Sequence, residues 1–289
     1  MLGLGTGINK LSAAEAASIA ARNAGSYLLD DYSGAAAAYS LRQLSSTYSG
    51  SSVKVRRASD NVEADIGFAS GELDTTALAS HCGASDGFVS VWYDQANSNN
   101  VTQATAANQP KIYDGTTGVV TENGKPALEF ASDVLQVSVT SSDIISTDAE
   151  NTLVSVMRQN SANANNTLAH MASPRYVIYT DFSGVLYYDA GNNSTNRLSV
   201  SSPSGWDDNQ HLLFWSSSLT LQQICVDGTQ LASDTSQSTI TSASTTLDIG
   251  TRSSTYLNGF VQELIFYNSD QSSNRSNIED NINTFYSIY

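Results

Sequence analysis

Two short segments place an aromatic ring directly beside carboxylates, a combination of side chains that recognises sugars and cations. The first is WYDQ, with Trp92 and Asp94, and the second is GWDDNQ, with Trp206, Asp207 and Asp208. An indole ring offers a flat apolar face with a polar edge, and carboxylate oxygens bind hydroxyl groups or calcium. We therefore predict that these five residues bind a ligand, either a glycan or a calcium ion, and that none of them is catalytic.

Both segments also have a purely structural interpretation. Trp92 lies near the end of the run FVSVWY, which is apolar on both faces like a strand covered on both sides, so its ring would then belong to the core. Asp94 stands where this strand passes into a long polar loop, and an aspartate there can cap the turn through its carboxylate. GWDDNQ would likewise be an exposed turn. The sequence leaves both interpretations open.

Few other residues have the spacing of a catalytic or metal site. His81, His170 and His211 show no ligand-like spacing, and Cys82 and Cys225 are predicted to be free thiols. The early GLGTG follows no strand that would make it a nucleotide-binding loop. We therefore predict neither a zinc site nor an organic cofactor.

The charge of the chain excludes several classes of partner. Its 289 residues include 28 acidic and 13 basic side chains, a net charge of −15, so nucleic acids and anionic membranes repel it. No stretch reaches the roughly 18–20 apolar residues of a membrane span. The N-terminus also lacks the basic and apolar regions of a secretion signal. We predict a protein that binds neither nucleic acid nor a membrane.

Most of the chain reads as short strands that would position these segments. Charged residues make up only 14% of it, and short polar side chains cover the surface as they do on solvent-facing strands. RYVIYTD and GVLYYDAG flank FSG like the two strands of a hairpin, and Asp227-Gly228 is the signature of a type I′ turn. Many short strands separated by turns indicate a sandwich or a barrel.

Three segments are predicted to be helical. Residues 12–24 open with a capping-box pattern, and the Ala-rich residues 35–44 form a second candidate. Near the C-terminus, Ile278, Ile282 and Phe285 recur at i, i+4 and i+7, which is one stripe of a helix. This last helix would pack its apolar stripe back on the strands.

A set of motifs spread over residues 37–289 is shared with a known family. The segments are VRRASDN, DIGF, WYDQ, NQP, NGKPALEF and LNGFVQELIFYNSDQSS. They resemble the arabinofuranosidase B catalytic domain and, more closely, bacteriophage and bacterial proteins that combine this module with a concanavalin A-like (laminin G-like) sandwich. The resemblance implies an all-β jelly roll of two antiparallel sheets over residues 25–289, with a short C-terminal helix. Residues 1–24 would be an arm with a short helix, used for attachment or oligomerisation.

The resemblance does not extend clearly to the catalytic carboxylates. Retaining glycosidases use two carboxyl groups about 5–5.5 Å apart. In the arabinofuranosidases a nucleophilic Glu lies in a mid-domain strand and an acid/base Asp follows a late strand, and Tyr176 and Arg252 stand at the corresponding positions here. A slip of a few residues would make Asp181, Asp189 or Asp248 the displaced carboxylate. We therefore predict that the protein is not an enzyme, with a glycoside hydrolase of the α-L-arabinofuranosidase type as the alternative.

The resemblance and the absence of a secretion signal favour a bacteriophage virion structural protein, such as a head decoration, a fibre or a tail-associated subunit. It would assemble into the virion in the host cytoplasm and contact other virion proteins through residues 1–24. We also expect it to form a homo-oligomer and to display its lectin-like sandwich to glycans. A stand-alone carbohydrate-binding lectin is a further alternative.

Overall fold

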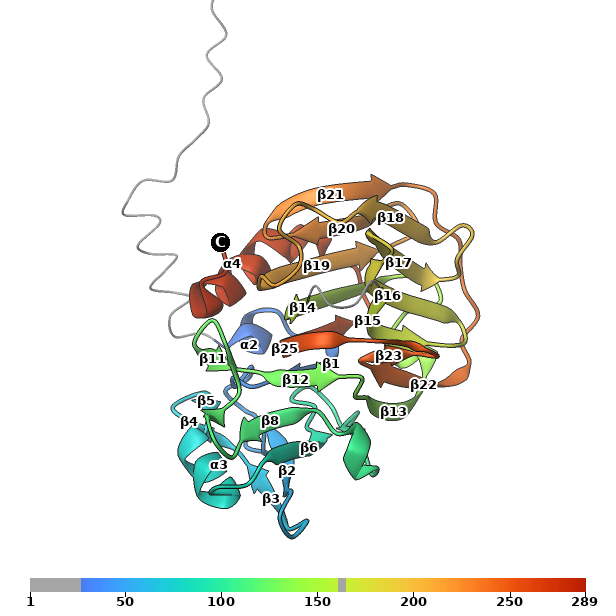
Figure 1. Cartoon of the computed structure of the whole chain (residues 1–289). Coiled ribbons are helices and arrows are strands. Elements are labelled where there is room, and N and C mark those ends of the chain that lie inside the picture. The colour runs from blue at the N-terminus through green and yellow to red at the C-terminus, as the bar shows by residue number, and fades with distance from the viewer. Residues whose placement is uncertain (1–26, 161–164) are drawn as a thin grey trace, which may run out of the picture.

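The computed structural model describes residues 27–160 and 165–289, which form mostly antiparallel strands (Figure 1). The predicted arm, the predicted helix of residues 12–24 and the predicted unit of residues 1–24 lie outside the described residues. Nineteen of the described strands join into one hydrogen-bonded sheet. No helix within the two described ranges is long and apolar enough to cross a membrane.

The first run of this sheet contains ten strands, each antiparallel to its neighbours. In hydrogen-bonding order they are β3 (Glu63–Ile66), β2 (Val53–Arg57), β6 (Gly87–Trp92), β7 (Val101–Thr102), β13 (Leu135–Thr140), β22 (Ser244–Ile249), β15 (Asn165–Met171), β16 (Arg175–Phe182), β17 (Val185–Gly191) and β18 (Arg197–Ser201). The predicted hairpin around FSG is confirmed as β16 and β17.

The second run is organised around one long strand. In order it contains β1 (Ala35–Ser40) and β12 (Leu128–Ala131) along the same edge of β25 (Asn258–Tyr267), then β14 (Asn151–Gln159), β19 (His211–Ser217), β20 (Gln222–Val226) and β21 (Thr229–Asp234). The predicted type I′ turn joins β20 to β21, with φ of 49° at Asp227 and 74° at Gly228.

One strand, β8 (Lys111–Asp114), joins the two runs. Lys111 pairs with Phe88 of β6 and with Glu129 of β12. At the other end of the sheet, β18 and β21 contact each other. The sheet therefore curls into a nearly closed, barrel-like form (Figure 1). The predicted all-β class with a C-terminal helix is confirmed, whereas the two sheets expected of a sandwich are continuous through β8.

Short elements complete the fold. They are the strands β9 (Gly118–Val119), β4 (Phe68–Ala69), β5 (Glu72–Leu73), β10 (Thr121–Glu122), β11 (Lys125–Pro126), β23 (Thr251–Arg252) and β24 (Thr255–Tyr256), the α-helices α2 (Leu28–Asp31), α3 (Thr75–Cys82) and α4 (Arg275–Tyr286), and the 3₁₀ turns Ala106–Asn108, Ser141–Asp143 and Ser272–Asn274. The sequence analysis missed α3, although Asp74 caps it by accepting the Ala77 N–H. The predicted C-terminal helix is confirmed as α4, with Ile278 and Ile282 fully buried.

Large apolar side chains fill the space inside the curled sheet. Tyr188 and Trp215 pack with their ring centroids 5.7 Å apart, and both are fully buried. A second apolar cluster lies where α4 packs on the outer side of β14, β19 and β25. Both cysteines are buried free thiols, as predicted.

Residues 35–44 are not helical, which corrects the sequence-based prediction. Ala35–Ser40 form β1, whose six residues are all buried and pair with β25. Ala37 faces the inner cluster and Ala38 faces the cluster under α4, so the small side chains let the strand lie between two packed layers. This long-range pairing overrides the intrinsic preference of alanine for helices.

Candidate active site

Trp92 and Asp94, two of the predicted ligand-binding residues, lie in the interior. Trp92 is fully buried, and its ring centroid is 5.8 Å from that of Tyr39. The Asp94 carboxylate is 2% exposed and accepts the backbone N–H groups of Ala38, Ala96 and Asn99 at 2.8–3.0 Å. A ligand reaches neither residue in this structure, so their arrangement follows the structural interpretation: the ring packs the core, and the carboxylate fastens the loop.

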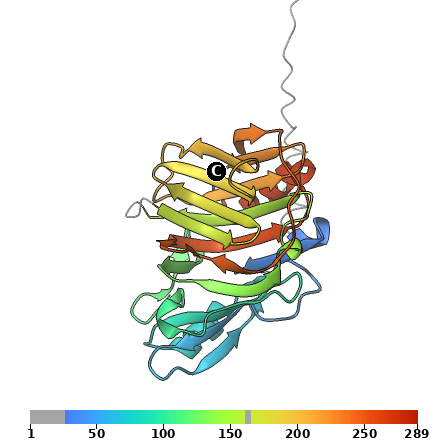
Figure 2. The ribbon, with the colours of Figure 1, turned by 90° about the vertical axis from the view of Figure 1, so that its right-hand side faces the viewer.

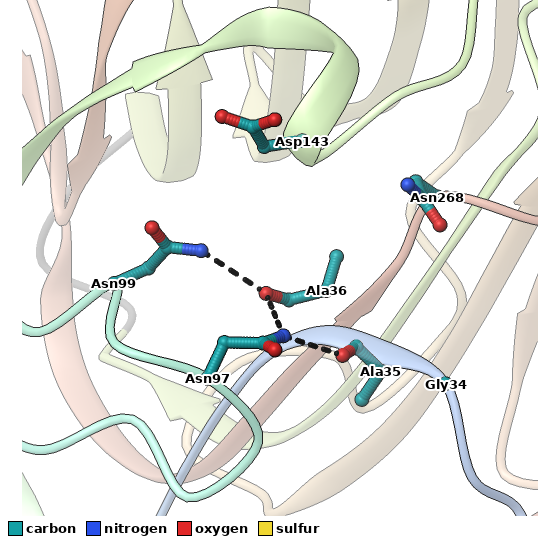
Figure 3. A pocket seen from close by; sticks show the side chains of 7 residues that line it. All are labelled: Gly34, Ala35, Ala36, Asn97, Asn99, Asp143 and Asn268. Carbon is teal, nitrogen blue, oxygen red and sulfur yellow. Dashed lines mark hydrogen bonds between the residues drawn. The ribbon is translucent and has the colours of Figure 1, made fainter.

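The loop that Asp94 fastens lines a pocket of about 410 Å³ at the start of β1 (Figure 3). Asn97 donates its side-chain N–H groups to the carbonyl oxygens of Ala35 and Ala36, and Asn99 donates to Ala36 as well. Asp143 and Asn268 stand on the opposite side of the pocket (Figure 3). The amide N–H groups of the two loop asparagines therefore hold β1 in place.

The three predicted residues of GWDDNQ have different surroundings. Trp206 is 3% exposed, donates its indole N–H to the carbonyl of Thr180 at 2.7 Å and stacks on His211. The Trp206 ring is therefore part of the packed interior, and it offers no surface for a sugar. Asp207 and Asp208 are exposed, and the backbone N–H of Asp208 binds the carbonyl of Gln159. This anchored turn brings Asp207 to the end of β14.

Asp181 lies near the same place at the end of β16, and its side chain points away from the outer face of the strand. The pairing of β15 with β16 skips one residue just before Asp181, so the alternation of the strand shifts there. Phe182, the next residue, therefore packs on Tyr179 on the outer face. Burial raises the pKa of the Asp181 carboxyl; the N–H of Gly184, donated at 2.7 Å, lowers it, and the negative charge of Asp207 raises it further. The net pKa of Asp181 lies above its ordinary value.

Gln159 connects the two carboxyl groups. Its side-chain Nε2 donates to Asp207 Oδ1 at 2.6 Å, and the same side chain is a hydrogen-bond partner of Asp181. Two oxygens that share one amide group in this way lie roughly 5 Å apart. That separation matches the pair of carboxyl groups in a retaining glycosidase. Asp181 and Asp207 therefore form a candidate catalytic pair.

Aromatic rings and an arginine lie on the outer face of β16, opposite to Asp181. The ring centroids of Tyr179 and Phe182 are 5.2 Å apart, and Tyr187 meets both edge-on. The guanidinium of Arg252 lies over the Tyr179 ring and donates to its hydroxyl at 2.5 Å. Figure 2 looks onto this face, where the yellow strands β16 to β18 turn toward the reader and no helix crosses them. These outer-face residues are separate from Asp181, Asp207 and Gln159, which we call the carboxylate site.

The other two carboxylates considered from the sequence are already paired. Asp189 is fully buried between Arg175 and Arg197, which each approach it to 2.5 Å, and Asp248 binds His170 at 3.2 Å. Three strand spacings separate Asp248 from Asp189, about 14 Å, which is too far for a glycosidase pair. Neither residue is therefore assigned to the chemistry.

Tyr176, placed from the sequence where the family has its nucleophile, points into the core. Its ring is fully buried against Tyr188 and Phe266. Asp181, five residues later, is the acidic residue that β16 carries. Arg252, by contrast, does lie on the outer face. Sequence reasoning missed Gln159, because no local pattern marks an amide that bridges two distant carboxylates.

No group of three or more His, Cys, Asp or Glu side chains able to hold a metal ion occurs in residues 27–160 and 165–289. These residues therefore contain no cluster of carboxylates that would be a candidate calcium-binding site. The exposed Asp207 is the one of the five predicted ligand-binding residues that lies in the carboxylate site.

Comparison with known proteins identifies the relatives of this chain. A family model described as "Alpha-L-arabinofuranosidase B, catalytic" matches residues 30–196, more than half of the chain. A GH54 α-L-arabinofuranosidase soaked with a cyclic sulfate inhibitor is 18% identical with a TM-score of 0.68, and an arabinofuranosidase complexed with arabinofuranosyl-α-1,2-xylobiose is 18% identical with a TM-score of 0.62. Both matches cover 88% of this chain and 64% of the other, so this chain spans less than two thirds of those proteins. At this identity the likeness establishes the fold. A search of curated proteins found no match.

These matches correct the main functional predictions. The family match and the arabinofuranosidase structures favour a glycoside hydrolase, so the predictions of a bacteriophage virion structural protein and of a protein that is not an enzyme were wrong. They depended in part on the absence of a carboxylate at Tyr176 and Arg252, the positions that were aligned with the catalytic residues of the family. The chain belongs to the family of α-L-arabinofuranosidase B catalytic domains.

Proposed function

We propose that this protein is a glycoside hydrolase that cleaves α-L-arabinofuranosyl linkages at the carboxylate site. The observation that carries the proposal is the Asp181–Gln159–Asp207 arrangement, in which one side-chain amide is a hydrogen-bond partner of both carboxyl groups. Membership of the arabinofuranosidase B family supports the substrate class. We also propose that the curled sheet is a concanavalin A-like jelly roll whose two layers are bridged by β8.

The two carboxyl groups differ in a way that assigns their roles. Burial raises the pKa of Asp181, which lets this group hold a proton and act as the general acid. Asp207 is exposed and acts as the nucleophile. Asp181 gives its proton to the glycosidic oxygen while a carboxylate oxygen of Asp207 bonds to the anomeric carbon and the leaving group departs. Asp181 then takes a proton from water, which attacks the same carbon and releases Asp207.

This assignment departs from what the family resemblance implies. The resemblance places the nucleophile on the mid-domain strand, here β16, and the acid after the late strand, where Arg252 stands. An arginine carries no transferable proton at neutral pH, so a second carboxylate must complete the pair. Asp207, on the loop before β19, supplies it.

Leaving-group dependence tests the roles. We would compare an arabinofuranoside of 2,4-dinitrophenol, which leaves without protonation, with an alkyl arabinofuranoside, which needs an acid. Asp181→Asn should lower kcat on the alkyl substrate by about 10²–10⁴-fold and affect the dinitrophenyl substrate far less. Asp207→Asn should abolish turnover of both substrates.

Asp148→Asn is the matched control, because Asp148 is exposed and lies just before the start of β14, whereas Gln159 ends that strand. The two positions are roughly 30 Å apart along the strand. Wild-type turnover by the Asp181 and Asp207 variants on both substrates would remove this site from the reaction. Absence of turnover by the wild-type protein on both would contradict the activity itself.

A further inference from the structure

His211, the first residue of β19, has both ring nitrogens within hydrogen-bonding distance of acceptor oxygens. Nδ1 lies 2.7 Å from Asp227 Oδ2, and Nε2 lies 3.1 Å from the backbone carbonyl oxygen of Trp206. The second oxygen of Asp227 accepts the backbone N–H of Leu212 at 2.8 Å, so this carboxylate is an acceptor on both sides. A neutral imidazole carries one N–H, whereas an imidazolium carries two. The two contacts together therefore require a proton on each ring nitrogen of His211.

The other two histidines make fewer contacts of this kind. Nε2 of His81 lies 3.1 Å from the carbonyl oxygen of Val55, and Nδ1 of His170 lies 3.2 Å from Asp248. Neither ring has a second hydrogen bond within residues 27–160 and 165–289. One N–H satisfies each of these two rings, so among the three histidines the second proton is required at His211.

The surroundings of the His211 ring favour a positive charge. The ring stacks on that of Trp206, with centroids 4.5 Å apart and planes 18° apart, which places the imidazolium over an aromatic face. Asp227 contacts it directly. The other titratable or charged side chains around this pair are Glu122, Asp208, Glu279, Arg158, Arg275 and Tyr289. Arg158 is paired with Glu122 and Arg275 with Glu279, so neither arginine opposes a cation at His211.

The carbonyl group that accepts from Nε2 belongs to the residue just before Asp207. On the other side of Asp207, the backbone N–H of Asp208 binds the carbonyl of Gln159 at 2.8 Å. The side chain of Gln159 holds Asp207 Oδ1 at 2.6 Å. The backbone is thus anchored on both sides of Asp207, and His211 supplies the anchor at Trp206.

We propose that His211 is a positioning residue for Asp207: Asp227 holds it as an imidazolium, and its Nε2–H fixes the backbone carbonyl that precedes the proposed nucleophile. The inference rests on the proposed function for the role of Asp207. Since the side chain of His211 is buried and both ring nitrogens are engaged, it acts through the position of Asp207 and transfers no proton to the substrate.

Nitrogen NMR of the whole chain labelled with ¹⁵N-histidine tests the protonation without turnover. At pH 7.5 a solvent-exposed histidine is mostly neutral, whereas His211 should carry a proton on both ring nitrogens. Asp227→Asn should remove the second proton, because its amide can donate to Nδ1 while Nε2–H stays on the carbonyl of Trp206. His211→Asn identifies the signals of this ring by removing them. A wild-type His211 that is neutral at pH 7.5 would overturn the proposal.

Two substitutions distinguish positioning from general packing. The amide nitrogen of glutamine lies about as far along the side chain as Nε2, so His211→Gln can still donate to the carbonyl of Trp206, whereas His211→Asn cannot reach it. We expect His211→Asn to lower kcat about 10–100-fold with little change in KM, and His211→Gln to recover most of the loss. The backbone amide signals of Asp207 and Asp208 should shift in His211→Asn and stay close to those of the wild type in His211→Gln.

His170→Asn is the matched control, since His170 also contacts an aspartate through Nδ1, and it should leave kcat and the two amide signals unchanged. Equal effects of His211→Asn and His211→Gln, or unshifted amide signals in His211→Asn, would contradict the positioning role. If the wild-type protein hydrolyses no arabinofuranoside, the NMR results still decide whether His211 holds this loop, and the proposed function alone fails. Thermal denaturation checks that each variant is folded; if His211→Asn is not, the protonation of Asp227→Asn decides.

Discussion

Asp94 and Asp181 are both buried aspartates at the end of a strand, yet they have different partners. Asp94 accepts three backbone N–H groups, and all of them belong to the segments that it holds together. Asp181 is held by the hairpin backbone at Gly184 and shares Gln159 with a second carboxylate. Burial by itself therefore does not mark a catalytic carboxyl group. The hydrogen-bond partners mark it, because only the arrangement around Asp181 leaves a carboxyl group that can give up a proton.

Removing Asp94 should give the largest change in stability. Asp94→Ala leaves three backbone N–H groups of buried or half-buried segments without an acceptor, at about 1–3 kcal/mol for each fully buried group. We expect a loss of about 3–5 kcal/mol in the free energy of unfolding, measured by urea denaturation. Asp181→Asn should lose less than about 1 kcal/mol. Equal destabilisation by both substitutions would contradict the distinction between them.

Glu279 in α4 extends the comparison to a buried carboxyl group that is not in the site. Burial raises its pKa to about 7, Arg275 opposes the shift, and Asp280 and Asp227 add to it. The folded state therefore holds the proton more tightly than the unfolded chain, whose glutamates titrate near 4.3. This contribution is complete below about pH 4 and is lost as the pH rises through 7.

Glu279→Gln should abolish that part of the pH dependence, on the order of 2–3 kcal/mol between pH 4 and pH 7.5. Urea denaturation across this range measures it. Asp148→Asn, an exposed carboxylate, serves as the reference and should leave the slope unchanged. A slope that Glu279→Gln does not alter would mean that other groups determine the pH dependence.

Among substitutions at Asp94, Glu279 and Gln159, the one at Gln159 should change the stability least, but it should clearly lower the activity. Gln159→Ala removes the amide that holds Asp181 and Asp207 together, so we expect kcat to fall about 10–100-fold. The Gln159 hydrogen bond also lowers the pKa of Asp181, so its loss should raise that pKa and move the alkaline limb of the kcat/KM profile to higher pH. An unchanged profile would show that Gln159 does not act on Asp181.

The strands and the C-terminal helix could be predicted because their signals are local. The 3.6-residue spacing of Ile278 and Ile282 gave α4, and the Asp227-Gly228 turn gave the hairpin of β20 and β21. Residues 35–44 were misassigned because β1 owes its conformation to β25, more than 200 residues away. The link through β8 is equally long-range, since Lys111 pairs with strands on both sides.

The site was predicted only in fragments. Asp207 was named as a ligand-binding residue and Asp181 as one of three displaced carboxylates, but nothing in the sequence put them together. They meet because the end of β14 carries Gln159 between the end of β16 and the loop before β19. The position of Asp181 could not be read from the alternation of β16, because the pairing with β15 skips Thr180 just before it, and no local pattern shows this irregularity.

The curled sheet also affects how copies of the protein meet in solution. An open sheet presents unpaired N–H and C=O groups that can capture a strand from another molecule. Here the two outermost strands, β18 and β21, contact each other. The strand β3 at the far end of the first run is only four residues long and carries Glu63 and Asp65, which discourage edge-to-edge pairing. These features disfavour aggregation through the unpaired N–H and C=O groups of edge strands, although the protein has few charged residues.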